Sequence, residues 1–196
     1  MPTVKLERIA DIQGGYQAKK EMIKTAQGSH FLIQSKDFDS HKNLLTETLM
    51  SFLPERKPEI YSVHKGDVLF QARGMSHFAY YVKENLENAL ASSSFYILRV
   101  KSDKLLPEYL AWRLNQKDAQ NYFKANACGG GISFISKKVL SEMKIHIPPV
   151  SIQKKVSKIA MLNNRVEFLQ KRLSSLRTQF TNAVCMKAIQ KQESKP

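Results

Sequence analysis

The last quarter of the chain carries an apolar repeat that constrains the fold more than any other feature. Ser151 stands where it can cap a helix, and neither Pro nor Gly occurs between Ser151 and Glu193. Past the first turns, apolar residues recur at intervals of three and four, which is typical of a coiled-coil seam. The seam residues are Ile152, Val156, Ile159, Leu162, Val166, Leu169, Leu173, Leu176, Phe180 and Ala183. The sequence predicts one long helix over residues 151–192, followed by a disordered tail at 193–196.

This helix is too long to be buried by the rest of the chain. About 40 residues at ~1.5 Å each make a rod of ~60 Å, whereas a domain of 150 residues is only about 30 Å across. Pairing with another helix is the favoured way to cover the seam. A helix folded back along its own domain, or one lying on a membrane surface with its basic face toward anionic lipid, remains open.

Residues 1–150 have a different pattern, with short β-favouring segments separated by turn residues. The expected strands are 31–33, 67–70, 79–82, 95–100 and 145–147. Helices are expected from Pro107 to Asn115, from Asp118 to Ala127 and from Ser136 to Met143. The fold class is therefore α+β: a mixed domain over residues 1–150 with a curved or barrel-like sheet, followed by the long helix.

Charge gives the first indication of a partner. The formal net charge is +14, and residues 151–196 supply +8 of it with 10 basic and two acidic side chains. A surplus of this size in 196 residues favours a polyanionic partner, nucleic acid before a membrane surface. The two cysteines, Cys128 and Cys185, do not have the spacing of a metal site. We expect them to be free thiols in a reducing compartment. With no apolar run of about 18 residues, we expect a cytoplasmic protein without a membrane span.

The sequence offers no catalytic or metal-binding constellation. Neither a dinucleotide-binding nor a Walker-type glycine motif is present, and the five histidines are scattered. Carboxylates such as Asp37, Asp39, Glu59 and Asp67 lie among turn residues rather than in an array that would hold Mg²⁺. We therefore predict neither a catalytic residue nor a metal site nor a cofactor in this chain.

Three loops that contain glycine are the candidate binding elements, although each could be an ordinary turn. They are residues 13–20, 65–76 and 128–133. A cation beside a flexible glycine can approach phosphate, and an arginine can also read a guanine edge. Predicted base-proximal residues are Tyr16, Arg73, Ser76, His77 and Ser133, with Gly14, Gly15 and Gly74 shaping the loops. Predicted phosphate contacts are Lys19, Lys20, Lys124, Lys137 and Lys138.

Several segments, taken in order, resemble the specificity subunit of bacterial type I restriction-modification systems. They are Lys5 to Gly15, Lys65 to Leu69 with Arg73-Gly74, Ile97-Leu98-Arg99, Pro107 to Leu110, a Gly-rich turn before Ile132 and Leu140, and Ile147-Pro148-Pro149-Val150 with Gln153. The last junction is the most specific. The family typically has Pro-Pro-Leu followed by Glu-Gln, so Ile152 stands here in place of the acidic residue.

The resemblance implies a target recognition domain over residues 1–150 and a spacer helix after it. Full specificity subunits carry two of each, with their helices paired antiparallel, whereas this sequence has one of each and looks like a half subunit. A homodimer through the long helices would rebuild the complete arrangement and read an interrupted palindrome, with half-sites up to ~18 bp apart. Expected partners are double-stranded DNA, a modification subunit that holds S-adenosylmethionine, and a restriction subunit.

Three other functions stay open at this point. The chain could be a coiled-coil interaction protein whose charge serves only solubility. It could be a decoy or regulatory fragment that joins a resident restriction system. It could also be a nuclease or methyltransferase of unrecognised type, which would turn over DNA without a second protein.

Overall fold

The computed structural model describes residues 3–17, 28–55 and 57–193. The chain divides into two compact units, residues 1–157 and 158–196. The strands are β1 (Thr3–Lys5), β2 (Ala10–Gly14), β3 (His30–Ile33), β4 (Met50–Phe52), β5 (Val68–Gln71), β6 (Arg73–Gly74), β7 (Ala79–Tyr81), β8 (Ala89–Ala91), β9 (Phe95–Val100), β10 (Ser133–Phe134) and β11 (Lys144–His146). The helices are α1 (Pro107–Leu114), α2 (Lys117–Asn126), α3 (Lys137–Glu142) and α4 (Val150–Glu193), with short 3-10 turns at Leu6–Arg8, Ser35–Asp37, Thr46–Thr48 and Pro58–Tyr61.

A four-stranded antiparallel sheet, in the order β2-β9-β5-β7, forms the centre of the first unit. Both of its faces are covered, which explains why β5 is buried at every position. Successive side chains of a strand point to opposite faces, so Val68 and Phe70 join one core cluster and Leu69 joins another. The mixed α+β fold expected from the sequence is confirmed.

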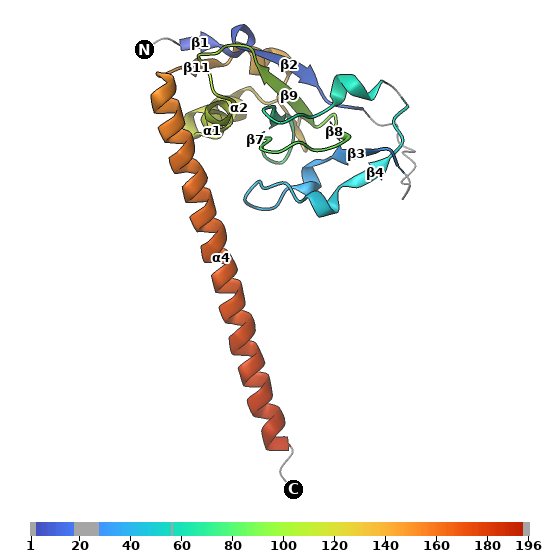
Figure 1. The fold of residues 1–196 in the computed structure, drawn as a ribbon, viewed down its shortest axis with the longest axis vertical. Coiled ribbons are helices and arrows are strands. Elements are labelled where there is room, and N and C mark those ends of the chain that lie inside the picture. Colours follow the sequence, from blue (N-terminus) through green and yellow to red (C-terminus); the bar gives the residue numbers. More distant parts are fainter. Residues whose placement is uncertain (1–2, 18–27, 56, 194–196) are drawn as a thin grey trace. The chain divides into compact units, whose positions relative to one another are not determined.

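Different layers cover the two faces of this sheet. Residues of α1, α2 and α3 pack on the face that holds Val68, Phe70 and Leu98. The opposite face meets a smaller sheet of order β4-β3-β8, in which β3 and β8 run parallel. Figure 1 shows β3 and β4 across the central strands from α1 and α2. The first unit is thus a three-layer arrangement of helices, sheet and sheet.

Local signals set the boundaries of the short helices. Pro107 occupies the first position of α1, where its fixed φ and missing N–H cost nothing. Ser136 caps α3, because its hydroxyl oxygen accepts a hydrogen bond from Val139 N at 3.2 Å. The predicted helices at Pro107, Asp118 and Ser136 are confirmed to within one or two residues.

The start of α4 differs from the prediction. The helix begins at Val150, and the carbonyl of Pro149 accepts the first bonds, from Ile152 N at 2.9 Å and Gln153 N at 3.1 Å. Ser151 therefore lies inside the helix and is exposed, so its predicted capping role is wrong. Pro148 and Pro149, which cannot continue the preceding strand, define the junction instead.

Gln153 fastens this first turn of α4 to the first unit. The side chain is fully buried. Its Oε1 accepts from Leu106 N at 2.8 Å, and its Nε2 donates to the carbonyls of Lys104 and Pro148, each at 2.7 Å. One amide thus joins the segment before α1 to the segment before α4 and satisfies three backbone groups, of which the carbonyl of Pro148 is buried and the other two are partly buried.

Candidate nucleic-acid interface

Parts of the three glycine-bearing loops selected from the sequence meet at one end of the central sheet. Lys65, Gly66 and Asp67 of the second loop lie at the other end of β5, where Val82 N donates to Asp67 O. Gly14, at the end of β2, pairs with Tyr96 near the start of β9. Residues 73–76, which include β6, lie between β5 and β7. Ala72 N and Arg73 N both donate to the carbonyl of Ser94, which precedes β9. The third loop joins them because Ile135 N donates to Ala72 O at 2.8 Å. Backbone bonds therefore bring the candidate elements together.

The second and third loops form a small antiparallel ribbon, β6 with β10. Ser133 pairs with Gly74, and Phe134 pairs with Arg73. The Arg73 guanidinium lies over the Phe134 ring, 5.3 Å from its centroid, and is exposed to solvent. An arginine held by stacking keeps its fork of N–H donors free for a phosphate or a base edge.

The buried side chain of His77 contacts the ribbon through Ser133. The Ser133 hydroxyl donates to Gly74 O at 2.9 Å, and its oxygen lies 2.9 Å from Nε2 of His77. Nδ1 of His77 donates to the carbonyl of Gln71 at 3.1 Å, and the His77 ring stacks beside Phe70. His77 is buried, so it positions Ser133 and the ribbon; the predicted contact of its side chain with bases is wrong.

Two glycines have conformational reasons for their positions. Gly74 has a φ angle of +150°, a backbone conformation that residues with a side chain rarely adopt. At Gly15, a Cβ atom would lie 2.1 Å from the carbonyl oxygen of Ser92. Gly15 therefore permits a close approach between two backbone segments rather than a contact with a ligand. Ser76, which was predicted to lie near the bases, is exposed and follows the end of β6 by two residues.

Tyr16 does not fit its predicted position next to the bases. It is only 4% exposed and packs with Phe52 and Tyr61, at ring-centroid distances of 5.4 Å and 5.3 Å. Its hydroxyl accepts from Glu55 N at 3.0 Å. The prediction is wrong because the aromatic ring fills a core cluster beneath the loop, a fact that the glycine-aromatic-lysine pattern does not reveal.

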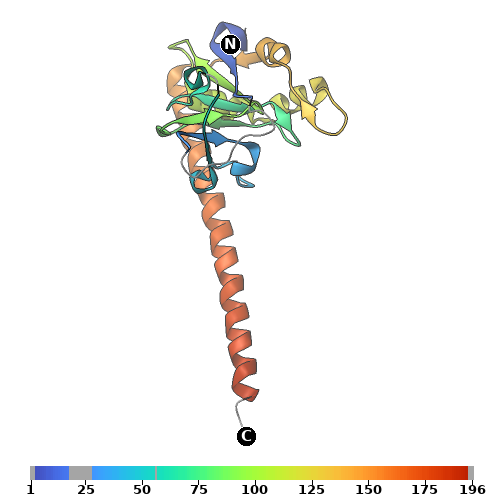
Figure 2. The same cartoon turned by 90° about the vertical axis from the view of Figure 1, so that its right-hand side faces the viewer.

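The predicted lysine contacts have different outcomes. Lys19 and Lys20 lie outside the described residues. Lys124 is exposed near the end of α2, four residues before the third loop, and Lys138 is exposed on the first turn of α3. Figure 2 shows the segment between α2 and α3, in yellow, at the right-hand edge of the first unit.

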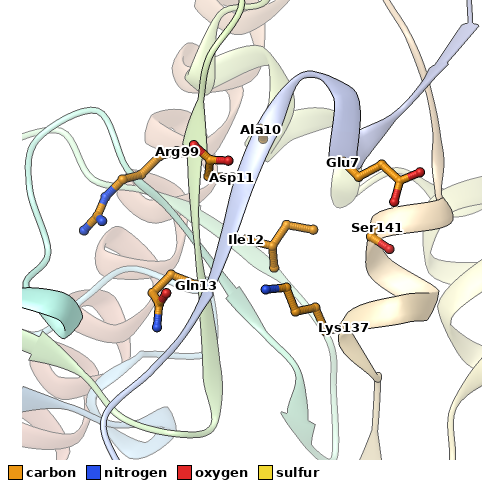
Figure 3. A pocket seen from close by; sticks show the side chains of 8 residues that line it. All are labelled: Glu7, Ala10, Asp11, Ile12, Gln13, Arg99, Lys137 and Ser141. Carbon is orange, nitrogen blue, oxygen red and sulfur yellow. The ribbon is translucent and has the colours of Figure 1, made fainter.

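Lys137 has acidic neighbours. Figure 3 shows it extending from α3 toward β2, in a hollow of about 490 Å³ that Glu7 and Asp11 also line. Arg99 lines the same hollow, so two carboxylates and two cations balance there and leave no net positive charge to attract a phosphate. The backbone N–H of Lys137 has a different function, because it donates to the Tyr96 hydroxyl. Burial raises the pKa of that hydroxyl, while this bond and the nearby Arg73 charge oppose the shift.

The structure adds residues that the sequence patterns missed. A second hollow, of about 410 Å³, opens next to Ser94 and is lined by Tyr16, Leu32, Gln34, Ser35, Lys36, Ser92, Ser93 and Ser94. Hydroxyl groups and a lysine are groups that commonly bind DNA phosphates. Its residues come from three separate segments of the sequence, so no local signal marked them.

The second unit consists of the long helix from residue 158 onward. Ile159, Leu162, Val166, Leu169, Leu173, Leu176 and Phe180 are each between 46% and 71% exposed. At the start of α4, Ile152 is also exposed, whereas Val156 packs against the core of the first unit. Val156 is therefore not free for a partner helix, and its place in the predicted seam is wrong.

The described residues contain neither a metal site nor a membrane span. No group of three His, Cys, Asp or Glu side chains there could hold a metal ion. None of the helices there has the length and hydropathy that a membrane span requires.

The fold is that of type I restriction-modification S subunits. The chain is similar to the S subunit from M. genitalium (TM-score 0.59, 17% identity, covering 87% of this chain and 41% of that one). It is also similar to the HsdS subunit from Thermoanaerobacter tengcongensis (TM-score 0.56, 20% identity, 87% and 39%). A chain in a structure on complex assembly and conformational transition of the type I R-M system gives a TM-score of 0.64 at 17% identity, over 93% and 43%. This chain thus spans about two fifths of the length of each of these chains.

Residues 1–176 match the family model of the type I restriction modification DNA specificity domain. The chain belongs to this family, as its sequence motifs indicated. Specificity subunits of type I systems are non-catalytic. No curated protein matches the chain significantly.

Proposed function

We propose that this protein is the sequence-reading component of a cytoplasmic type I restriction-modification system, with one half-site read by each chain. The observation that carries the proposal is the assembly of Arg73, Ser133 and their supporting loops at one end of the central sheet, in a chain of the DNA specificity family. Phosphate contacts would come from exposed lysines and the hydroxyl-lined hollow, while base contacts would come from the ribbon.

We also propose that two copies pair through the second unit. A two-fold axis would bury the exposed seam of each helix against the other and place two identical recognition units on one DNA. The target is then an inverted repeat, interrupted by unread base pairs over at most ~18 bp. The modification subunit, which would hold S-adenosylmethionine, and a restriction subunit are the proposed protein partners.

Selection of bound duplexes from a random library tests this function. The full chain is used alone and together with a co-encoded modification subunit. An interrupted palindrome is the expected result, because two identical readers sit on one duplex. An asymmetric motif would contradict the homodimer, and no enrichment under either condition would contradict DNA reading and leave a coiled-coil scaffold.

The charge beside the seam predicts opposite salt effects on pairing and on DNA binding. Lys158, Arg165 and Arg172 stand directly before the seam residues Ile159, Val166 and Leu173. In an antiparallel two-fold pair the same flank of each helix meets its copy, so these cations face one another. Like-charge pairs cost about 0.3–0.5 kcal/mol each at low salt.

Raising the salt concentration should therefore tighten the homodimer several-fold, because screening weakens this repulsion. DNA binding should weaken over the same range through counterion release. Sedimentation equilibrium and fluorescence anisotropy measure the two constants. A homodimer that loosens with salt would show that these flanks do not face each other.

A further inference from the structure

The β6–β10 ribbon ends in two of the most exposed large apolar side chains among the residues that the structure describes. The position after the Gly74–Ser133 pair is occupied by Met75 on one strand and Ile132 on the other. Met75 is 96% exposed and Ile132 is 64% exposed. Exposure of one such residue is ordinary, but two at the end of the same ribbon indicate a contact that is made only with a partner.

The ribbon has a rigid base. Ala72 N and Arg73 N both donate to Ser94 O, and Cys128 and Phe134 exchange two backbone bonds of 3.0 and 2.8 Å. The Ser133 hydroxyl adds its bond to Gly74 O. The two apolar side chains are therefore presented by a fixed element rather than by a loose loop, which lowers the entropic cost of using them in recognition.

The charge around the tip selects the class of partner. Arg73 lies two residues from Met75 and has its guanidinium on the Phe134 ring, and Lys138 follows Phe134 by four residues. No acidic residue occurs between Gln116 and Glu142 apart from Asp118. An apolar tip on a ribbon that also carries an exposed arginine is complementary to a polyanion that offers an apolar group.

The major groove of DNA offers these features together. It is about 12 Å wide and admits a two-stranded β-ribbon, and its edges carry the thymine methyl group and the guanine O6 and N7 acceptors. Arginine pairs with that guanine edge, and apolar side chains contact that methyl group. The minor groove displays no methyl group and would leave the tip without a specific apolar contact.

We propose that the β6–β10 ribbon enters the major groove of the half-site, where Met75 and Ile132 read the methyl group of a thymine next to a guanine contacted by Arg73. This inference rests on the proposed function and deepens it, because it assigns the reading of two neighbouring bases to named side chains. Met75 and Ile132 are thus specificity-determining residues.

The test uses the half-site duplexes obtained by selection and removes single groups from the DNA. Each thymine is replaced in turn by uracil, which lacks the methyl group, and each guanine by 7-deazaguanine, which lacks N7. The proteins are the full wild-type chain, the double variant Met75→Ser with Ile132→Ser, Arg73→Ala, and the control Ile60→Ser, which alters an exposed apolar residue of the Pro58–Tyr61 turn. Thermal melting should be the same for the serine variants and wild type, because the altered side chains are exposed.

For wild type and the control, uracil at one thymine should weaken binding roughly three- to tenfold, the effect of losing one buried methyl contact. The double variant should bind the thymine duplex correspondingly less well and show no further loss with uracil. Arg73→Ala should abolish the sensitivity to 7-deazaguanine at a neighbouring position.

Equal uracil sensitivity in wild type and the double variant would overturn the inference, as would insensitivity at every thymine or a half-site without thymine. A minor-groove wedge at the same tip would give this insensitive result. Failure of the proposed function is distinct, because wild type would then select no sequence from the library at all.

Discussion

Replacing Leu169 and Leu173 by lysine should convert the protein into a monomer and abolish recognition of the two-sided DNA site. Both side chains are about half exposed on the second unit, at 49% and 51%, and both lie in the seam. Complete burial of a leucine is worth about 1.5–3 kcal/mol, and the dimer would lose four. The dissociation constant of the dimer should rise by about a thousandfold or more. Light scattering and sedimentation measure this change.

The matched control is Asn164→Lys with Thr178→Lys, which adds the same charge to the same helix outside the apolar repeat. Because both double variants gain two cations per chain, they should gain non-specific DNA affinity equally. Only the seam variant should lose the preference for a duplex with two half-sites over a duplex with one. A seam variant that remains dimeric would show that the chain pairs through another surface.

Much of the fold could be predicted from the sequence because its signals are local. The strand from Phe95 to Val100 and the helix from Pro107 are predicted to within one residue. Aromatic and β-branched residues favour a strand locally, and a proline at the first helical position favours the start of a helix. The long helix was predicted for the same reason, as an uninterrupted repeat specifies its own secondary structure.

The wrong predictions concern residues whose positions depend on contacts with other parts of the chain. Tyr16 looked like a surface aromatic beside two glycines, but it packs on Phe52, which is 36 residues away. Val156 has seam spacing but lies against the core of the first unit. Ser151 has the chemistry of a helix cap, yet the backbone bonds from Ile152 and Gln153 to Pro149 start the helix one residue earlier.

The candidate site was predicted only in part. The composition of the loops identified Arg73 and Ser133, and these two residues do come together in the ribbon. Their pairing joins segments separated by about 60 residues, which single-sequence periodicity cannot reveal. Met75 and Ile132 carried no signal, because an apolar residue in a sequence is normally a core residue. Their exposure is what identifies them.

Gln153→Ala should cause the largest loss of stability among single polar substitutions in the first unit. The amide is fully buried and holds Leu106 N, Lys104 O and Pro148 O. Alanine would leave these three backbone groups without their partner. The buried carbonyl of Pro148 would bear the full cost of an unsatisfied group, about 1–3 kcal/mol, whereas water can replace part of the two bonds that are only partly buried. The free energy of unfolding should fall by about 2 kcal/mol, and the melting temperature by about 5 °C.

Denaturation followed by tryptophan fluorescence measures this effect, because the chain has a single tryptophan, Trp112, on α1 in the first unit. Gln170→Ala is the control, since Gln170 is an exposed glutamine of the same helix and alanine favours helices slightly more than glutamine does. Gln153→Glu separates size from hydrogen bonding, because a carboxylate of nearly the same shape can still accept from Leu106 N but cannot donate to the two carbonyls. If Gln153→Glu were as stable as wild type at neutral pH, the two donated bonds would not contribute to stability. If both substitutions destabilise the protein and Gln170→Ala does not, this buried amide is the link that fixes the first turn of α4 to the recognition unit.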